Sequence, residues 1–423
     1  MRDNAHLLTL TILRRNHGGR SALIGRATRC VFLTVAAWFA TLLLSSGLIV
    51  ASACATTAQP AGGFQTTAKY AILVDSTSNA VLFEHNADEP APPASMSKLM
   101  TLAVVYRAIS LGQLKLDDEF LVSEYAWRTG GAPSRTSAMM VPVNTRETLE
   151  QLIRGIVVQS GNDAAIAIAE GLAGSEEAFA KVMQAEAKRL GLRNSTFRNS
   201  TGLPHPEHRM SARDLVILAE HLIEDYPELY KLFAEREFRY RRHVFRNRNP
   251  LLDLDIGVDG LKTGFTSEAG HGVVASAVQG DRRLVVVVNG LETGNERRRE
   301  AQRLLEWGFR GFSKFDLFAS GDIVGQARVW GGTQFFVPLT GNGPLTVVLP
   351  RFPVNQRLTA EIVYEGPLKP PIASGAEVAK LRVRSSTGAV NEIPLYAAED
   401  VATAGVLRRG LDSAFHLAFG WLP

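Results

Sequence analysis

A serine and a lysine that could act together open an apolar stretch, "PPASMSKLMTLAVV", at residues 92–105. Ser95 precedes Lys98 by three residues, and in a helix residues three apart lie on one face, so the two side chains can meet. An amine beside a hydroxyl can remove its proton and create a nucleophile. The same serine could instead cap the helix by accepting a hydrogen bond from a backbone N–H of the first turn. The pattern therefore predicts either a nucleophile with its base or an ordinary helix start.

Two further motifs downstream favour the catalytic interpretation. Ser-Gly-Asn occupies residues 160–162 and Lys-Thr-Gly occupies residues 262–264, while the chain holds a single Ser-x-x-Lys pair. Chance readily produces any one of these motifs, but the three in this order are specific. Ser160 and Asn162 have their own alternative, because both residue types are common in turns and could cap the next helix.

The chemistry of the predicted base explains why a second lysine would be needed nearby. A free lysine has a pKa near ~10.4 and is charged at neutral pH, so it cannot accept a proton. Repulsion from Lys262 would lower the pKa of Lys98, and burial would act in the same direction. We therefore expect one lysine to act as the base while the other stays cationic.

The ordered motifs resemble the signature of the serine penicillin-recognising enzymes. The surrounding text is similar to the D-alanyl-D-alanine carboxypeptidases among the low-molecular-mass penicillin-binding proteins, and the similarity spans roughly residues 68–312, in "PASMSKLMT", "SGNDAAIAIAE", "SARDL", "VDGLKTGFT" and "LLEWGF". The resemblance implies a penicillin-binding-protein/β-lactamase-like transpeptidase domain of the α+β class. It also implies an acyl-enzyme that trims the terminal D-alanine from peptidoglycan stem peptides and that is acylated by β-lactams. It implies no cofactor and no metal ion.

The resemblance further assigns roles to individual residues. Ser95 would be the nucleophile, Lys98 the general base and Ser160 a proton relay to the leaving amine. Asn162 would donate a hydrogen bond to a substrate amide and help to place Lys98.

The remaining implied residues would bind the substrate. Lys262, Thr263 and Arg297 would hold its terminal carboxylate. The backbone N–H groups of Ser95 and of Phe265, which follows Gly264, would form the oxyanion hole. Phe265 departs from the polar or histidine residue that relatives can carry there. Arg297 stands in "ERRRE", where a solvated charge run is the ordinary alternative.

Alternating strands and helices must position these residues. "YAILVDSTSNAVLFEHN" predicts a β-hairpin with its turn at residues 76–79. Apolar periodicity predicts helices over residues 96–111, 146–158 and 163–172. Another helix should start at Ser211, with Asp214 completing a capping box. Three short strands over residues 258–290 and a helix over residues 294–311 complete an antiparallel sheet packed by helices.

The composition changes after this region. Short β-type runs broken by Gly, Pro and Asn predict a small all-β domain over residues 317–396. Residues 397–423 carry an amphipathic helix, which we expect to lie on a membrane surface because it is too polar to span one. An ordinary helix packed on the β domain is the alternative. The apolar face would consist of Leu407, Leu411, Ala414, Phe415, Ala418 and Leu422, opposite Arg408, Arg409, Asp412, Ser413 and His416.

Residues 1–55 have the layout of an export signal, with arginines ahead of an apolar run that ends in small residues. A retained membrane helix is the alternative, because the run is long enough to span a bilayer. Residues 56–67 would form a tether. Both cysteines, Cys30 and Cys54, lie in the leader, so a mature domain would have no thiol chemistry. We therefore expect a periplasmic protein anchored peripherally to the outer face of the cytoplasmic membrane.

Several other classes are disfavoured. A net charge of +4 with dispersed basic residues gives no nucleic-acid footprint. "HPEH" at residues 205–208 is a poor metal site because no third ligand cluster accompanies it. A class A β-lactamase would present a Glu in an E-x-x-L-N loop, and the chain has no Leu-Asn dipeptide. A D,D-endopeptidase acting on crosslinks shares all three motifs, and a catalytically idle wall-binding scaffold is the non-enzymatic alternative.

Overall fold

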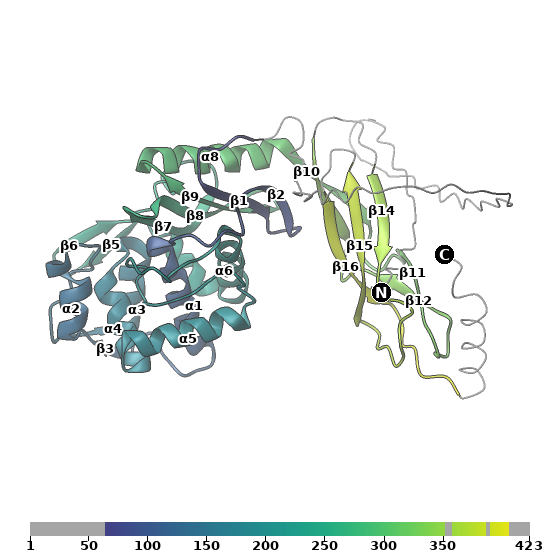
Figure 1. Ribbon diagram of the computed structural model, residues 1–423, viewed down its shortest axis with the longest axis horizontal. Coiled ribbons are helices and arrows are strands. Elements are labelled where there is room, and N and C mark those ends of the chain that lie inside the picture. The colour runs from purple at the N-terminus through teal and green to yellow at the C-terminus, as the bar shows by residue number, and fades with distance from the viewer. Residues whose placement is uncertain (1–63, 352–357, 386–389, 406–423) are drawn as a thin grey trace, which may run out of the picture. The chain divides into compact units, whose positions relative to one another are not determined.

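The computed structural model describes residues 64–351, 358–385 and 390–405, which fall into two compact units (Figure 1). The first unit is Phe64–Phe312, and the second begins at Ser313. The predicted export signal, most of the predicted tether and residues 406–423 of the predicted tail lie outside the described residues.

A five-stranded antiparallel sheet forms the centre of the first unit, in the order β2-β1-β9-β8-β7. Its strands are β1 (Tyr70–Asp75), β2 (Ala80–His85), β7 (Val258–Thr266), β8 (Gly270–Gln279) and β9 (Arg282–Leu291). The predicted hairpin and the three predicted consecutive strands are confirmed. Strand β7 lies at the edge of the sheet, so one side of it has no strand neighbour among the described residues.

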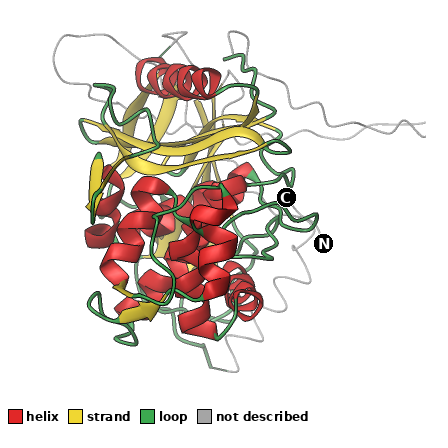
Figure 2. Ribbon diagram, turned by 90° about the vertical axis from the view of Figure 1, so that its left-hand side faces the viewer, coloured by secondary structure: helices red, strands yellow, loops and turns green. Residues whose placement is uncertain are grey.

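The sheet is covered on both faces, as Figure 2 shows, with helix α8 on one side and the other helices on the opposite side. The run of four valines at residues 285–288 reflects this arrangement, because successive residues of a strand point to opposite faces. Val285 and Val287 pack into the core on the side of the sheet opposite α8. Val286 and Val288 pack towards α8. A continuous apolar run is what a strand buried on both faces requires.

The helices of the first unit are α1 (Lys98–Ser110), α2 (Glu124–Gly130), α3 (Leu149–Arg154), α4 (Asn162–Ala173), α5 (Glu176–Arg189), α6 (Ala212–Asp225), α7 (Pro227–Tyr230) and α8 (Gly294–Gly311). Short turns of 3₁₀-helix occur at η1 (Ala94–Ser97), η2 (Ala132–Ser134) and η4 (Lys231–Ala234), and η3 (Gly155–Gln159) is a turn of π-helix. Two small hairpins pair β3 (Glu119–Leu121) with β4 (Arg146–Thr148) and β5 (Glu237–Tyr240) with β6 (His243–Arg246).

Four local predictions need correction. The helix expected from residue 146 begins at Leu149, because Arg146–Thr148 pairs with β3 and the Thr148 hydroxyl caps the helix. The helix expected from residue 96 starts as the 3₁₀ turn η1. The tether was expected to run to residue 67, but residues 64–67 belong to the first unit, because Phe64 is buried against Phe83 and Trp307.

The fourth correction concerns the expected capping box at the start of α6. The Ser211 hydroxyl caps the helix by accepting from the backbone N–H of Asp214. The Asp214 carboxylate bonds elsewhere, to Ser195 and to the backbone of Arg193 and Asn194. A complete capping box stands instead at the start of α8, between Thr293 and Glu296.

The second unit is all-β, as predicted. Its strands are β10 (Phe312–Phe318), β11 (Gly325–Arg328), β12 (Phe336–Thr340), β13 (Leu345–Pro350), β14 (Leu358–Val363), β15 (Glu377–Ser385) and β16 (Val390–Ala397), in a five-stranded sheet of order β11-β12-β16-β15-β14 and a pair of β10 with β13. Ala397, Val401 and Ala404 are buried in this unit, so its chain continues past residue 396, where the anchor was expected to start. None of the described helices is long and apolar enough to cross a membrane.

Candidate active site

The turn η1 and the first residue of α1 bring the predicted nucleophile and base together. The Nζ atom of Lys98 lies 3.1 Å from Oγ of Ser95 and 2.6 Å from the backbone oxygen of Thr201. Lys98 is fully buried. The helix-cap alternative is wrong, because Ser97 holds the N-cap position of α1 and no side chain bonds to the first turn there. The hydroxyl of Ser95 is therefore paired with an amine.

The loop at residues 199–202, which sequence reasoning missed, holds the base in place. Oδ1 of Asn199 accepts hydrogen bonds from Thr201 and Gly202, which fixes the backbone that presents the Thr201 oxygen to Lys98. Gly202 has φ +77, and a Cβ there would lie 1.9 Å from the oxygen of Ala94. Only glycine allows this loop to pack against the turn that carries Ser95. The only sequence signal is a Thr-Gly pair, which no spacing rule links to residue 98.

Ser160 and Asn162 follow the π-turn η3 and enter α4. Ser160 has a left-handed backbone, with φ +65, and its buried Oγ has no hydrogen-bond partner among the described residues. Nδ2 of Asn162 donates to the hydroxyl of Thr136, while its buried Oδ1 is also unpartnered within the described chain. The position before α4 is Gly161, and no side chain caps it. The capping alternative is therefore wrong for both residues.

Asp163 anchors a loop beside the site. Its buried carboxylate accepts hydrogen bonds from the backbone N–H groups of Met139 and Val141. The backbone N–H of Asn162 donates to the oxygen of Ser137, 2.8 Å away. The start of α4 thus fixes the loop that contributes Ser137 to the pocket described below.

Strand β7 supplies the Lys-Thr-Gly motif at the edge of the sheet. Lys262 and Thr263 are buried, and Nζ of Lys262 donates to the backbone oxygen of Thr263 at 3.1 Å. A Cβ on Gly264 would lie 2.9 Å from the oxygen of Pro93 and 3.1 Å from Ala94. Glycine is therefore needed for β7 to approach the turn η1, which places the motif beside Ser95.

Burial, more than the charge of Lys262, depresses the pKa of the base. Removal from water is the largest cause that lowers the pKa of Lys98 to about 7, and the positive charge of Arg248 adds to it, while Glu176 and Asp163 act in the opposite direction. Burial and the charge of Lys98 hold the pKa of Lys262 well below its usual value. Since both pKa values are lowered, the two lysines resist being charged together near neutral pH.

A pocket of about 370 Å³ opens beside Ser95, and Lys98, Asn162 and Lys262 are not among the residues that line it. Its lining consists of Ser95, Ser137, Ser160, Arg248, Thr263, Gly264, Phe265, His271 and Arg297. Arg297 reaches the pocket whereas its neighbours Arg298 and Arg299 are exposed, so the solvated-run alternative fits those two neighbours but not Arg297. Phe265 is 56% exposed.

Arg248 is a pocket residue that sequence reasoning missed. Burial lowers the pKa of Arg248 and of Arg297. Within the described part of the chain neither arginine forms an ion pair with a carboxylate, and Nε of Arg297 is buried without a partner. Arg248 lies in "RNRNP", where nothing in the sequence separates it from Arg246, and both residues are exposed. A pocket lined by two guanidinium groups without carboxylate partners is suited to an anion.

The residues of "HPEH" serve other purposes. His208 is buried, and its Nε2 lies 2.7 Å from the hydroxyl of Ser97, next to the base. Glu207 pairs with Arg198 on the surface. No group of three or more potential metal-ligating residues occurs within residues 64–351, 358–385 and 390–405.

Comparisons with known proteins agree with this geometry. The profile of the peptidase S11 family, described as D-alanyl-D-alanine carboxypeptidase, matches residues 54–293. A second profile, the C-terminal domain of penicillin-binding protein 5, matches residues 312–403. The chain is 38% identical over 354 residues to the D-alanyl-D-alanine carboxypeptidase DacC of Escherichia coli, covering 82% of this chain and 88% of that protein.

Solved structures show the same relationship. Penicillin-binding protein 5 of Haemophilus influenzae matches with a TM-score of 0.71 and 34% identity, over 80% of this chain and 98% of that one. Penicillin-binding protein D2 of Listeria monocytogenes in its ampicillin-bound form matches with a TM-score of 0.51 and 29% identity, over 58% of this chain and 99% of that one.

Proposed function

The chain belongs to the D-alanyl-D-alanine carboxypeptidase family of serine hydrolases, which acts on peptidoglycan peptides and binds β-lactams, and we propose that its acyl-enzyme forms on Ser95 with Lys98 as general base. One observation carries this assignment. The amine of Lys98 lies 3.1 Å from the hydroxyl of Ser95, and its pKa is lowered to about 7. A base with a pKa near the working pH is the most effective proton acceptor.

The proposed acylation proceeds as follows. Oγ of Ser95 attacks the carbonyl carbon of the penultimate D-alanine, and its proton passes to Nζ of Lys98. The backbone N–H groups of Ser95 and Phe265 stabilise the oxyanion. The peptide C–N bond then breaks, the ester on Ser95 forms, and the leaving amine takes its proton through Ser160. Water hydrolyses the ester and releases the shortened stem peptide.

The unpartnered atoms around the nucleophile support the remaining roles. The free Oγ of Ser160 is available to relay a proton, and the unpartnered Oδ1 of Asn162 can accept a hydrogen bond from the substrate. Nδ2 of Asn162 donates one of its two N–H groups to Thr136, so the other N–H can donate to a substrate, as the family resemblance implies.

The terminal carboxylate of the substrate would bind at the guanidinium end of the pocket. Thr263 and Arg297 hold it there, as the resemblance implies, and the structure adds Arg248 to the set. A bound carboxylate would also favour the charged form of Lys262, whose pKa is otherwise depressed by burial and its cationic neighbours.

A product assay tests the proposed reaction. A pentapeptide ending in D-alanyl-D-alanine and a crosslinked peptide dimer are each incubated with the protein, and the products are separated by mass. We expect free D-alanine and the tetrapeptide from the first substrate at the higher rate. Faster cleavage of the dimer would assign a D,D-endopeptidase instead. If neither substrate is hydrolysed, the wall-binding scaffold is the remaining interpretation.

We also propose that the protein is exported to the periplasm, and that residues 406–423 anchor it to the outer face of the cytoplasmic membrane. The amphipathic pattern of that segment and the signal-like leader support this location. The burial of Val401 and Ala404 moves the separable segment to start after Gly405, not after Tyr396.

The anchor is tested with two leaderless proteins, residues 56–423 and residues 56–405. The longer protein should sediment with phosphatidylglycerol vesicles and the shorter one should not, while both hydrolyse the pentapeptide equally. Neutral phosphatidylcholine vesicles are the control. Sedimentation of the shorter protein would contradict the proposal, and so would the absence of both from the pellet.

A further inference from the structure

His271 lies at the guanidinium end of the pocket and has no role in the reaction described so far. It is the second residue of β8, and its register partner on β7 is Phe265. The two rings stack with centroids 4.1 Å apart and an angle of 26° between their planes. Both residues line the pocket. The stack therefore fixes the plane of the imidazole beside the ligand space.

One ring nitrogen of His271 lacks a partner. Its Nδ1 is buried and makes no hydrogen bond with any described residue. Buried polar atoms are normally hydrogen-bonded, and an exception calls for an explanation. The unpartnered Nε of Arg297 is a second such atom at the same end of the pocket.

Gly294, at the start of α8, locates the two side chains relative to each other. A Cβ built on Gly294 would lie 3.8 Å from Nδ1 of His271 and 3.9 Å from Nη2 of Arg297. The imidazole and the guanidinium therefore reach the same corner. Residue 294 has no side chain, so none of its atoms beyond Cα stands between these two groups.

The charges around the imidazole favour an anionic ligand. Arg297 faces it from α8, and Glu296 of the same helix is the acidic group that acts on it. Burial and the charge of Arg297 lower the pKa of His271, so the ring is neutral at neutral pH. A neutral imidazole has one N–H, which can point to an acceptor.

Resting on the carboxypeptidase function proposed above, we propose that His271 is a substrate-binding residue, whose Nδ1–H donates a hydrogen bond to the ligand carboxylate held by Arg297. The ligand class is a peptide, or a β-lactam, that ends in a free carboxylate. A carboxylate in this corner would pair the two polar atoms that the free protein leaves unpaired.

Two substitutions separate this role from packing. His271→Phe keeps a ring against Phe265 but removes the nitrogens. His271→Asn loses the ring but places an amide N–H near the position of Nδ1. His243→Phe is the matched control, because His243 also stacks on a phenylalanine, Phe245, but belongs to β6 and does not line the pocket.

The measurement is the second-order rate of acylation by ampicillin and by its methyl ester, followed by intact mass. For His271→Phe we expect roughly a 10-fold loss with ampicillin, the size of one charge-assisted hydrogen bond, and less than about a 2-fold change with the ester. His271→Asn should retain most of the ampicillin rate, and His243→Phe should match the wild type with both probes.

Other results would overturn the inference. An unchanged ampicillin rate in His271→Phe, or equal losses with ampicillin and the ester, would leave His271 a packing residue only. A wild-type protein that ampicillin does not acylate would overturn the proposed function as well. Should His271→Phe misfold, ¹⁵N NMR of the wild-type histidines decides. The Nδ1–H form of His271 after ampicillin acylation supports the inference, and the Nε2–H form contradicts it.

Discussion

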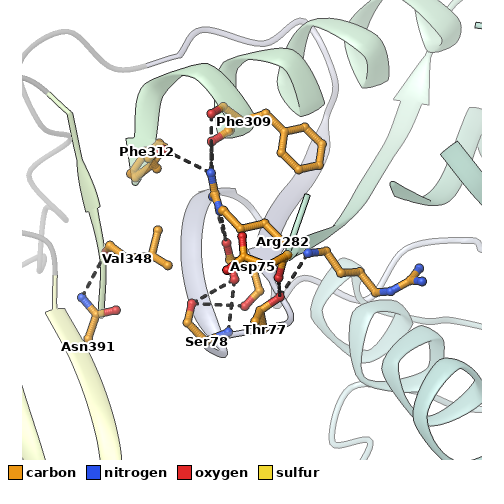
Figure 3. Close-up of polar contacts among 11 residues, drawn as sticks. Asp75, Thr77, Ser78, Arg282, Phe309, Phe312, Val348 and Asn391 are labelled. Atoms are coloured by element: carbon orange, nitrogen blue, oxygen red, sulfur yellow. Dashed lines mark hydrogen bonds and ion pairs between the residues drawn. The ribbon is translucent and has the colours of Figure 1, made fainter. Parts of the chain in front are cut away.

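Two groups of charged residues in the unit Phe64–Phe312 are treated in opposite ways. The first joins Asp75 at the end of β1 to Arg282 at the start of β9, and Figure 3 shows its contacts. Nε and Nη2 of Arg282 each lie 2.8 Å from Oδ2 of Asp75, and Nη1 reaches the backbone oxygen of Phe312. Oδ1 of Asp75 accepts from the backbone and hydroxyl of Ser78. This pair is thus supplied with partners on both sides.

The second group surrounds the nucleophile. Arg248 and Arg297 line the pocket, Lys98 bonds to Ser95 and Lys262 precedes Thr263, and within the described residues none of the four forms an ion pair with a carboxylate. Their pKa values are all lowered by burial. The polar atoms nearby include several with no partner.

The difference separates a structural role from a catalytic one. A buried charge with a full set of partners ties elements together, and removing one partner is costly. Charges removed from water without an ion-pair partner destabilise the folded state but present shifted pKa values and donors to a ligand. The predictions below test whether the two groups respond to substitution in opposite ways.

The largest effect is expected at the base. Lys98→Arg keeps the positive charge, but a guanidinium stays protonated and cannot accept the proton of Ser95. We expect the acylation rate with ampicillin to fall roughly 10²–10⁴-fold, the usual share of general base catalysis. Stopped-flow or intact-mass kinetics measure it. A variant that keeps most of its rate would make Lys98 an electrostatic residue only.

The next effect is on stability, at the partnered pair. Arg282→Met leaves the Asp75 carboxylate buried without its cation, and we expect about 3–5 kcal/mol less free energy of unfolding. Urea denaturation followed by fluorescence measures the free energy of unfolding of the first unit in each protein. Arg310→Met on α8 is the control, since its ion pair with Glu306 is exposed. If both variants lose the same free energy of unfolding, the buried pair contributes no more to stability than an exposed one.

The group without ion pairs should respond in the opposite direction. Lys98→Met removes a buried amine, so the folded protein should lose no stability and gain up to ~2 kcal/mol at pH 6. The pKa of Lys98 is lowered from 10.5 to about 7 in the folded state, so between these pH values the unfolded chain binds more protons. The free energy of unfolding of the wild type therefore rises with pH in that window. The stability difference between Lys98→Met and the wild type should shrink accordingly. A loss as large as that of Arg282→Met would contradict the comparison.

The last prediction concerns the pH dependence of the wild type. Because Lys98 must be deprotonated, the acylation rate should fall about tenfold per pH unit below pH 7 and level off above it. Ampicillin acylation at a series of pH values measures the profile. A flat profile between pH 5 and pH 8 would exclude Lys98 as the titrating base.

Features that lie within one element were predictable from the sequence. The spacing of Ser95 and Lys98 fits the helical turn that η1 and the start of α1 form, and the run of valines in β9 fits a strand buried on both faces. Of the residues from separate segments, Ser160, Lys262 and Arg297 were indicated by the ordered motifs and the family resemblance, and others were missed. Arg248, His271 and the loop at residues 199–202 reach the site only through tertiary packing, and no spacing rule relates them to the motifs.

The charge balance of the site was also only partly predictable. The lowered pKa of Lys98 was expected, but its main cause is burial, and the added like charge is that of Arg248 instead of Lys262. Composition does not show which arginines line the pocket. Likewise the end of the β unit was placed too early, because the small residues Ala397 and Ala404 give no strong apolar signal although both are buried.

The central claim, that Ser95 is the nucleophile of a penicillin-recognising carboxypeptidase, is tested most directly by mass. The leaderless protein is incubated with ampicillin, its intact mass is measured, and the adduct is mapped by peptide fragmentation, alongside Ser95→Ala. We predict one ampicillin per chain, carried by Ser95, and no adduct on a folded Ser95→Ala variant. Stoichiometric labelling of that variant, or an adduct on any other residue of the wild type, would contradict the account.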